Sequence, residues 1–163
     1  MNKKYRVSLE KQQLIFSAAH FITFNRNICE QIHGHNYRVR CDIQCDLDEN
    51  GYVVDFIALR DELLKITTQL DHHVILPTQH DMIAVTPGSE SVEVTFKQKR
   101  WLFPLEDCVL LPIANTTAEL LASWIGEQLI ERFLNPRGVA WSELTIGVDE
   151  NEGQWAFCEF TPT

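Results

Sequence analysis

Residues 33–47 read HGHNYRVRCDIQCDL, and side chains of two kinds alternate along this stretch. The odd positions, from His33 to Leu47, are mostly apolar, whereas the even positions from Asn36 to Asp46 are polar. Successive side chains of a β-strand point to opposite faces of a sheet, so this alternation predicts a long strand with one buried face. His33 and His35 both lie on the less polar face of that strand.

The two histidines are spaced so that their rings could converge on one ion. Residues two apart on a strand share a face, with Cα atoms roughly 6.5–7 Å apart. An earlier stretch, from Leu14 to His20, also has apolar residues at alternate positions, and we expect a neighbouring strand that ends at His20. Three imidazoles are the ligand set with which zinc keeps a fourth position for water or substrate. The pattern therefore predicts a metal site, although a His-Gly-His taken alone more often packs or hydrogen-bonds.

Two helices are predicted downstream of this strand. Asp55 suits the N-cap of the first, and apolar residues then recur at helical spacing as far as Leu70. The second is predicted to begin near Thr116, because Thr116 and Glu119 have the spacing of a capping box. Residues 135–138 (NPRG) end it.

Two further strands are predicted near the end of the chain. The first contains Leu144, Ile146, Val148 and Glu150, which share one strand parity. Residues 151–153 (NEG) indicate a hairpin turn, and residues 155–160 return as the last strand. The order of elements is therefore β-β-α-α-β-β, which is typical of an α+β fold, here in a single domain of residues 1–163. Residues 77–112 are predicted to be an insertion, a hairpin-like excursion between the helices that is too short for a core of its own.

Composition limits the classes of function. The 163 residues are 45% hydrophobic and 23% charged, which is ordinary for a soluble globular protein. A net charge of −9 argues against nucleic acid or an anionic membrane surface as a partner and favours a small-molecule substrate. The chain has no apolar run long enough for a signal peptide or a membrane span, and its five cysteines show no paired spacing. We therefore expect a cytoplasmic protein with reduced thiols.

Six motifs, in this order, resemble the 6-pyruvoyl-tetrahydropterin synthase / 6-carboxytetrahydropterin synthase (QueD) family. They are FSAAH at 16–20, CEQIHGHNY at 29–37, VDF at 54–56, LDHH at 70–73, NTTAE at 115–119 and VDE at 148–150. The resemblance implies the tunnelling fold (T-fold), in which an antiparallel four-stranded sheet carries two helices on one face. It also implies a barrel-like homohexamer, a dimer of trimers, with active sites at the subunit interfaces.

The resemblance also implies which residues do the chemistry. It assigns acid–base catalysis to the Cys29 thiol, with Asp71 and His72 as its partner pair, and zinc binding to His20, His33 and His35. Zinc would act as a Lewis acid on the side-chain hydroxyls of a reduced pterin. Taken alone, Cys29 would more often be an inert thiol, and Asp71-His72 could be only a helix C-terminus at which imidazolium complements the dipole.

Substrate binding is implied for a second group of residues. Glu150 looks like the anchor of the pterin ring, since a carboxylate can accept two N–H donors from the 2-amino-pyrimidine edge. Backbone groups around Thr116 and Thr117 could bind the carbonyl edge of the ring. Glu150 could instead be a surface acid beside a turn, but it shares the parity of the apolar residues before it.

The residues before the histidine pair indicate the branch of the family. In queuosine-pathway enzymes the thiol stands four residues before the first histidine, as Cys29 stands before His33, whereas in the animal biopterin-forming synthases it lies further upstream. A folate-linked branch has a glutamate three residues before that histidine, and Glu30 occupies this place. This chain satisfies the queuosine-type and folate-type patterns at once.

The first hypothesis is accordingly a zinc-dependent lyase that converts 7,8-dihydroneopterin triphosphate to 6-carboxy-5,6,7,8-tetrahydropterin, releasing acetaldehyde and triphosphate. The second is a folate-branch cleavage to 6-hydroxymethyl-7,8-dihydropterin, alone or as an additional activity, with Glu30 as acid or base. A third hypothesis is a 6-pyruvoyltetrahydropterin synthase, and a fourth is a zinc- and pterin-binding protein without turnover.

Overall fold

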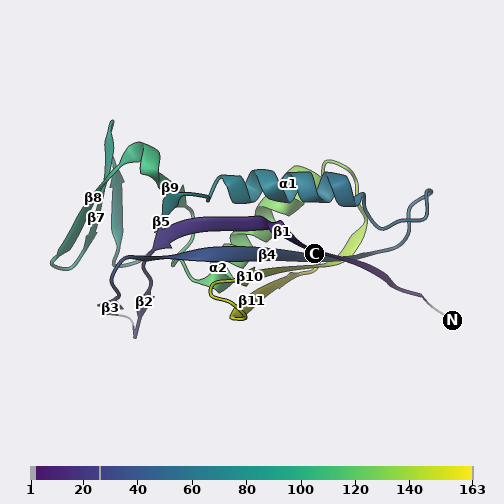
Figure 1. The fold of residues 1–163 in the computed structure, drawn as a ribbon, viewed down its shortest axis with the longest axis horizontal. Coiled ribbons are helices and arrows are strands. Elements are labelled where there is room, and N and C mark those ends of the chain that lie inside the picture. Colours follow the sequence, from purple (N-terminus) through teal and green to yellow (C-terminus); the bar gives the residue numbers. More distant parts are fainter. Residues whose placement is uncertain (1–2, 26, 163) are drawn as a thin grey trace.

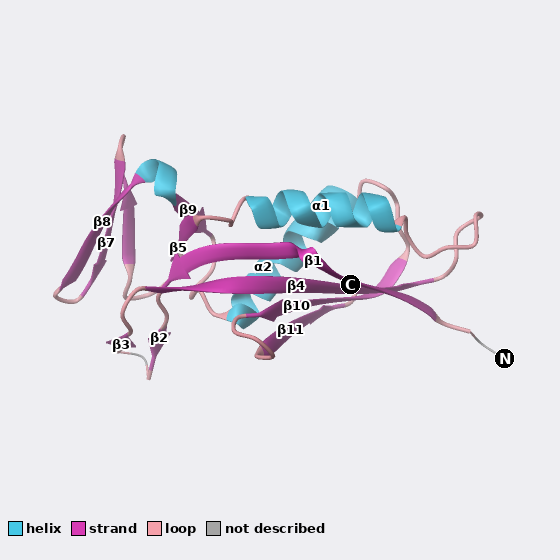
Figure 2. Ribbon diagram, in the orientation of Figure 1, coloured by secondary structure: helices cyan, strands magenta, loops and turns pink. Residues whose placement is uncertain are grey.

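A six-stranded sheet with two helices packed on one face forms the centre of the computed structural model, which describes residues 3–25 and 27–162 (Figures 1 and 2). The strands lie in the order β11-β10-β4-β1-β5-β9. The four longest of them are β1 (Tyr5–His20), β4 (His33–Cys45), β10 (Trp141–Asp149) and β11 (Trp155–Phe160). These four pair antiparallel with one another, in the order β11-β10-β4-β1, as the sequence predicts for an α+β fold of this order.

Two short strands extend the sheet beyond the four that the sequence predicts. β5 (His73–Pro77) lies parallel to the end of β1, with Ala18 opposite His73, and β9 (Cys108–Leu111) lies parallel to β5. The expectation of a purely antiparallel four-stranded sheet is therefore incomplete. Runs of four or five apolar residues show no clear period, and parallel pairing joins segments that are far apart in the chain.

The register of β1 against β4 brings the three predicted ligands together. His20 lies opposite His33, and Ala18 lies opposite His35. The buried face of β4 is the face that the sequence alternation predicts, because Tyr37, Val39, Cys41 and Ile43 are each at most 1% exposed. These side chains pack under both helices, so one apolar layer fixes the face on which the histidines stand.

The helices are α1 (Phe56–Thr68) and α2 (Ala118–Leu129), and a π-helical turn, Ile130–Leu134, follows α2. Asp55 caps α1 as predicted, its carboxylate accepting hydrogen bonds from two backbone N–H groups of the first turn. The predicted capping box on α2 is wrong by one residue, because the N-cap is Thr117 and the Thr116 hydroxyl donates to the Phe21 carbonyl instead. Within the described ranges, no helix is long and apolar enough to cross a membrane.

Residues 84–104, between β5 and β9, form a second, small sheet. Its strands are β6 (Ala84–Pro87), β7 (Ser91–Phe96) and β8 (Lys99–Pro104), all antiparallel, where the sequence predicts a single hairpin. Figure 1 shows β7 and β8 beyond the end of the main sheet, on the side where β1 ends and β4 begins. Near them lie β2 (Thr23–Phe24) and β3 (Ile28–Cys29), which form a short hairpin in the connection from β1 to β4.

Candidate active site

Three histidine side chains form a cluster at the shared end of β1 and β4. The nearest ligand nitrogens of His20, His33 and His35 all lie within 4.8 Å of one another. Their ring centroids are 4.8 Å apart for His20 and His33, 5.2 Å for His20 and His35, and 4.8 Å for His33 and His35. The structure thus brings together the three residues that the sequence predicts as metal ligands.

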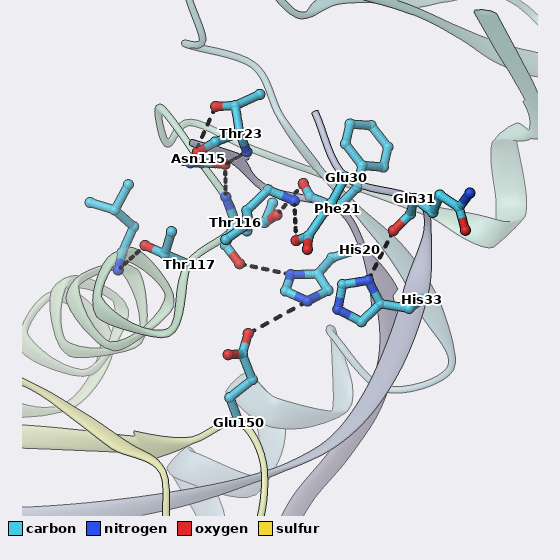
Figure 3. Close-up of polar contacts among 12 residues, drawn as sticks. His20, Phe21, Thr23, Glu30, Gln31, His33, Asn115, Thr116, Thr117 and Glu150 are labelled. Atoms are coloured by element: carbon cyan, nitrogen blue, oxygen red, sulfur yellow. Dashed lines mark hydrogen bonds and ion pairs between the residues drawn. The ribbon is translucent and has the colours of Figure 1, made fainter. Parts of the chain in front are cut away.

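Backbone carbonyls orient two of these rings (Figure 3). His20 Nδ1 lies 2.9 Å from the Thr116 carbonyl oxygen, and His33 Nδ1 lies 2.9 Å from that of Gln31. A carbonyl oxygen can only accept, so each Nδ1 carries the proton. In the neutral form of such a ring the lone pair is on Nε2, the nitrogen that remains for a metal.

His20 fits a metal ligand on independent grounds. Its side chain is only 1% exposed, and its Nε2 has no hydrogen-bond partner in the described part of the chain. Burial is the main reason that the pKa of His20 is lowered to about 4; the nearby His33 and His35 act in the same direction, and the hydrogen bond with Thr116 acts against it. The ring is therefore neutral at pH 7, with a buried lone pair that a divalent cation can satisfy.

Glu150 reaches the same nitrogen from the end of β10. Its Oε1 lies 3.5 Å from His20 Nε2, and its side chain is 29% exposed. A carboxylate oxygen facing a nitrogen lone pair repels it unless a cation or a proton stands between them. The position of Glu150 therefore makes the histidine cluster a better site for a cation. Part of this carboxylate also remains accessible to a ligand.

Glu30 and Cys29 are neighbours in the chain, but their side chains have different surroundings. The Glu30 carboxylate accepts a hydrogen bond of 2.9 Å from the Ile22 backbone N–H, and it lies beside His20, whose pKa its charge raises (Figure 3). Cys29 is 7% exposed, and burial raises the pKa of its thiol. It packs in an apolar cluster with Phe21, Leu76, Ile83, Val92, Val94 and Phe96.

Asp71 and His72 form a pair at the other side of β1. Asp71 Oδ2 lies 2.9 Å from His72 Nδ1, while Asp71 Oδ1 accepts from the Ser17 backbone N–H at 2.7 Å. The Ser17 bond is the main reason that the pKa of Asp71 is below its usual value. The His72 ring is 82% exposed and lines an open groove of about 560 Å³ with His35 and Asn36. Among the described residues, no hydrogen bond or ion pair joins Asp71 or His72 to Cys29.

Thr116 and Thr117 support the site from the start of α2. Thr116 is fully buried, and both its hydroxyl and its carbonyl have partners, Phe21 and His20. The Thr117 hydroxyl caps the helix. Thr116 thus holds His20 in place, and its hydroxyl and carbonyl, which already have partners, have little capacity left to bind a substrate.

Two further features at the site are not identified by the sequence analysis. Tyr37 is fully buried, its ring centroid lies 5.8 Å from that of His20, and its hydroxyl has no partner among the described residues. Arg38 donates from Nε and Nη2 to one oxygen of the buried Asp149, at 3.0 and 2.6 Å. Asp149 also accepts from the backbone N–H groups of Gly153 and Gln154, which fixes the turn beside Glu150. The VDE motif contains Asp149, but nothing in the sequence links it to Arg38.

Comparisons with known proteins find matches to most of the chain. The family model described as 6-pyruvoyl tetrahydropterin synthase matches residues 9–160. A protein of Methanocaldococcus jannaschii, provisionally named 6-carboxy-5,6,7,8-tetrahydropterin synthase, is 34% identical over 148 residues, 88% of each chain. A protein of Pyrococcus horikoshii with the same provisional name is 32% identical over 147 residues, 90% of this chain and 86% of its own.

Solved structures of similar proteins cover nearly the whole chain. The 6-pyruvoyltetrahydropterin synthase of Plasmodium vivax, in a variant in which a catalytic glutamate is replaced by alanine, superposes with a TM-score of 0.91. It is 29% identical, and the match covers 99% of this chain and 100% of that one. The Plasmodium falciparum enzyme gives a TM-score of 0.90 at 30% identity with the same coverage. The fold is therefore that of these T-fold enzymes.

Proposed function

The chain belongs to the 6-pyruvoyl tetrahydropterin synthase family, and from this premise we propose that it is a zinc-dependent pterin lyase. The proposed reaction converts 7,8-dihydroneopterin triphosphate and one water molecule to 6-carboxy-5,6,7,8-tetrahydropterin, acetaldehyde and triphosphate. The observation that carries the proposal is the convergence of three imidazoles with two carboxylates, Glu30 and Glu150, at one end of the β1–β4 pair. The provisional names of the archaeal relatives support the choice of product.

His20, His33 and His35 would hold the zinc ion. Bound there, zinc supplies Lewis acidity to the oxygens of the substrate side chain. The carbonyls of Thr116 and Gln31 fix the tautomer and the orientation of two of the rings before any ligand arrives. This preorganisation means that little conformational freedom is lost when the site is filled.

Glu150 would hold the pterin ring. Its carboxylate is close to His20 and partly accessible, so it can accept N–H donors from the ring while the substrate side chain lies over the histidines. The buried Asp149 and its bond to Arg38 hold the turn that presents Glu150.

Glu30 is the group that we propose to take and return the proton. Its carboxylate lies beside His20, and the Ile22 N–H fixes its orientation. Cys29 remains the alternative, but its buried, protonated thiol is surrounded by apolar side chains. The exposed Asp71–His72 pair would complete a site at an interface with a neighbouring subunit, where its ring could exchange protons with the substrate.

A second reaction, cleavage to 6-hydroxymethyl-7,8-dihydropterin, is favoured by a specific observation. Glu30, the residue of the folate-type pattern, places its charge beside the histidine cluster, whereas the Cys29 thiol lies among apolar side chains. A structural relative at 29% identity also has a catalytic glutamate. We therefore propose this product as an additional or substitute outcome of the same site.

Product identification separates the two reactions. The purified zinc-loaded protein is incubated with 7,8-dihydroneopterin triphosphate, and the products are identified by mass spectrometry. We expect 6-carboxy-5,6,7,8-tetrahydropterin together with acetaldehyde, whereas 6-hydroxymethyl-7,8-dihydropterin would establish the second reaction. Zinc binding without turnover of either kind would overturn both and leave a binding protein.

The metal is tested separately by its stoichiometry. We expect His35→Gln to weaken zinc binding by more than about tenfold, the loss that even an outer hydrogen-bond partner of a ligand causes. His80→Gln is the matched control, since His80 hydrogen-bonds Thr23 and lies outside the cluster. Equal zinc content in both variants would contradict the assignment.

A further inference from the structure

A concentration of positive charge lies next to the site in a chain that is otherwise acidic. The net charge of the protein is −9, yet residues 97–100 read KQKR. This stretch contains the turn from β7 to β8, and Lys97, Lys99 and Arg100 are all exposed. Nothing in the proposed reaction steps uses these three cations.

Direct contacts attach this turn to the segment that carries the proposed base. Lys99 Nζ donates to the Cys29 carbonyl at 2.6 Å and approaches the Glu30 carbonyl at 3.4 Å. Lys97 Nζ donates to the Asn27 carbonyl at 2.7 Å. An ammonium group has three donors, so Lys99 keeps at least one for a ligand.

Aromatic packing holds β8 in this position. The Trp101 ring stacks on Phe21, the residue after the ligand His20, with centroids 4.7 Å apart and planes 13° from parallel. Lys99 Nζ lies 5.9 Å from the centroid of the Trp101 ring. The contact of the partly buried Trp101 with the buried Phe21 therefore fixes the position of β8, which carries Lys99 and Arg100, relative to the histidine cluster.

The cations border a pocket that adjoins the zinc ligands. A cavity of about 430 Å³ is lined by Gln31, Ile32, Lys99, Arg100 and Trp101. The carbonyl of Gln31 is the one that orients His33. Figure 3 shows Gln31 next to His33, on the side away from His20, and Glu150 below His20. The pocket at Gln31 and the proposed ring anchor Glu150 therefore lie on opposite sides of the two histidines.

We propose that this pocket is the subsite for the triphosphate of the substrate, with Lys99 and Arg100 as its binding groups and Lys97 at its rim. The inference rests on the proposed function: a pterin ring at Glu150, with its side chain across the histidines, directs the triphosphate toward Gln31. Guanidinium and ammonium groups are the side chains that bind phosphate oxygens best. The excursion between the helices then has a role, because its β8 strand supplies the charge.

Arg100 has a competing ion-pair partner, so phosphate binding can be either weakened or strengthened by substitution. Its Nε donates to Glu93 Oε2 at 2.7 Å, and its Nη2 contacts the same oxygen. A bound polyphosphate would share or displace this carboxylate. Removing the Glu93 charge should therefore strengthen phosphate binding, whereas removing the Arg100 charge should weaken it.

The test is calorimetric titration of inorganic tripolyphosphate into the full-length protein at low ionic strength, with zinc content measured before and after to detect chelation. We expect Arg100→Gln and Lys99→Gln each to weaken binding by about tenfold or more, and Glu93→Gln to tighten it. Lys65→Gln, on the outer side of α1, is the control and should match the wild type. Equal affinity in wild type, Arg100→Gln and Lys99→Gln, or no binding by the wild type, would overturn the proposal.

Kinetics distinguish failure of the subsite from failure of the proposed function. Arg100→Gln should raise the KM for 7,8-dihydroneopterin triphosphate much more than that for 7,8-dihydroneopterin, because only the former enters the pocket. A uniform change in both would overturn the subsite. If the wild type acts on neither compound, the proposed function fails, and the tripolyphosphate titration still decides whether the pocket binds polyphosphate.

Discussion

At His20, the stability of the fold and the proposed metal binding have conflicting requirements. His20 is buried at the end of a core strand, and one of its two nitrogens has no partner within the described ranges. A buried polar atom without a partner costs stability. The Thr116 carbonyl accepts a hydrogen bond from Nδ1 and holds the ring in place. The loss of stability therefore comes only from Nε2, the atom that would bind the metal.

The pH dependence of stability follows from this burial. The pKa of His20 is about 4 in the folded protein against an ordinary 6.5, so between these pH values the unfolded chain binds a proton that the folded chain does not. Stability of the metal-free protein should therefore be full above pH 6.5 and fall toward pH 4, by at most about 3 kcal/mol from this residue.

Urea unfolding of the metal-free protein at several pH values measures this loss. The His20→Gln variant is the control, since it lacks the titrating ring. Parallel pH profiles for the two proteins would contradict the prediction.

Glu30 and Cys29 can be compared by two substitutions. Glu30→Gln keeps an oxygen to accept from the Ile22 N–H but removes the charge, and we expect turnover to fall by about 100-fold or more, as for loss of a general base. Cys29→Ala removes a buried thiol that lies among apolar side chains, and we expect a loss below about tenfold, less than the loss of a general acid or base causes. Single-turnover product formation measures both, and the reverse ranking would make Cys29 the catalytic group.

Tyr37 offers a test of an unpaired hydroxyl. Its ring stacks on Phe16 with centroids 4.7 Å apart, but its buried hydroxyl lacks a partner among the residues that are described. Tyr37→Phe should therefore change the free energy of unfolding by less than about 0.5 kcal/mol, or stabilise the protein, because no hydrogen bond is lost. Tyr37→Ala should cost about 3–5 kcal/mol through the cavity it leaves. A loss above about 1 kcal/mol in the Phe variant, measured by denaturant unfolding, would mean that the hydroxyl is bonded.

At the scale of elements, the residues before α2 support the histidine cluster together with the strands. The strand pair β1–β4 presents the three rings, and the residues before α2 provide the carbonyl that orients His20. Asn115 joins this segment to the β1–β4 connection, since its side-chain oxygen accepts from the backbone N–H groups of Thr23 and Thr116. Asn115 and Thr116, the two residues before the N-cap of α2, are thus held by contacts with the site.

Thr117 should be the cap on which α2 depends. We expect Thr117→Ala to lower the free energy of unfolding by about 1 kcal/mol, since its hydroxyl accepts from the Leu120 N–H. Thr68→Ala, at the exposed end of α1, is the control and should cost nothing, because alanine is the better helix former. Thermal unfolding measures both variants, and an equal effect would show that the cap contributes nothing.

At the scale of the whole molecule, the exposed parts of the site point to assembly. His72 is 82% exposed although the Ser17 N–H holds its partner Asp71 in place, and it lines a groove open to solvent. A catalytic pair needs shelter from water. A second subunit placed over this groove would provide it.

We therefore predict that the protein is a hexamer in which a second subunit completes the site. Six chains of 18.8 kDa give a hexamer of about 113 kDa, and light scattering of the purified protein should return this mass. Activity should fall on dilution to concentrations at which the assembly dissociates, because the Asp71–His72 pair would then be lost. A monomer with full activity would contradict this prediction.

Much of the site could be predicted from sequence because it depends on local periodicity. The alternation in residues 33–47 predicts both the strand and its buried face. The apolar residues at alternate positions from Leu14 to His20 predict a neighbouring strand that ends at His20. The errors are of another kind. The extra strands β5 and β9 arise from pairings between distant segments, and the cap at Thr117 arises from a competing bond of Thr116. The third strand of the excursion, β8, pairs with its neighbour β7 across a short turn.

The sequence by itself determines which side chains share a face, because the period of a strand is a property of the backbone alone. From this follows the shared face of the histidines; caps and helical spacing predict the two helices, and the resemblance to the family supplies the pattern around Cys29 and Glu30. Only the tertiary structure decides what each side chain meets. It buries Cys29 among apolar residues, places Glu30 and Glu150 near His20, and brings the cations of β8 to Gln31, since packing between segments far apart in the chain sets distance and exposure.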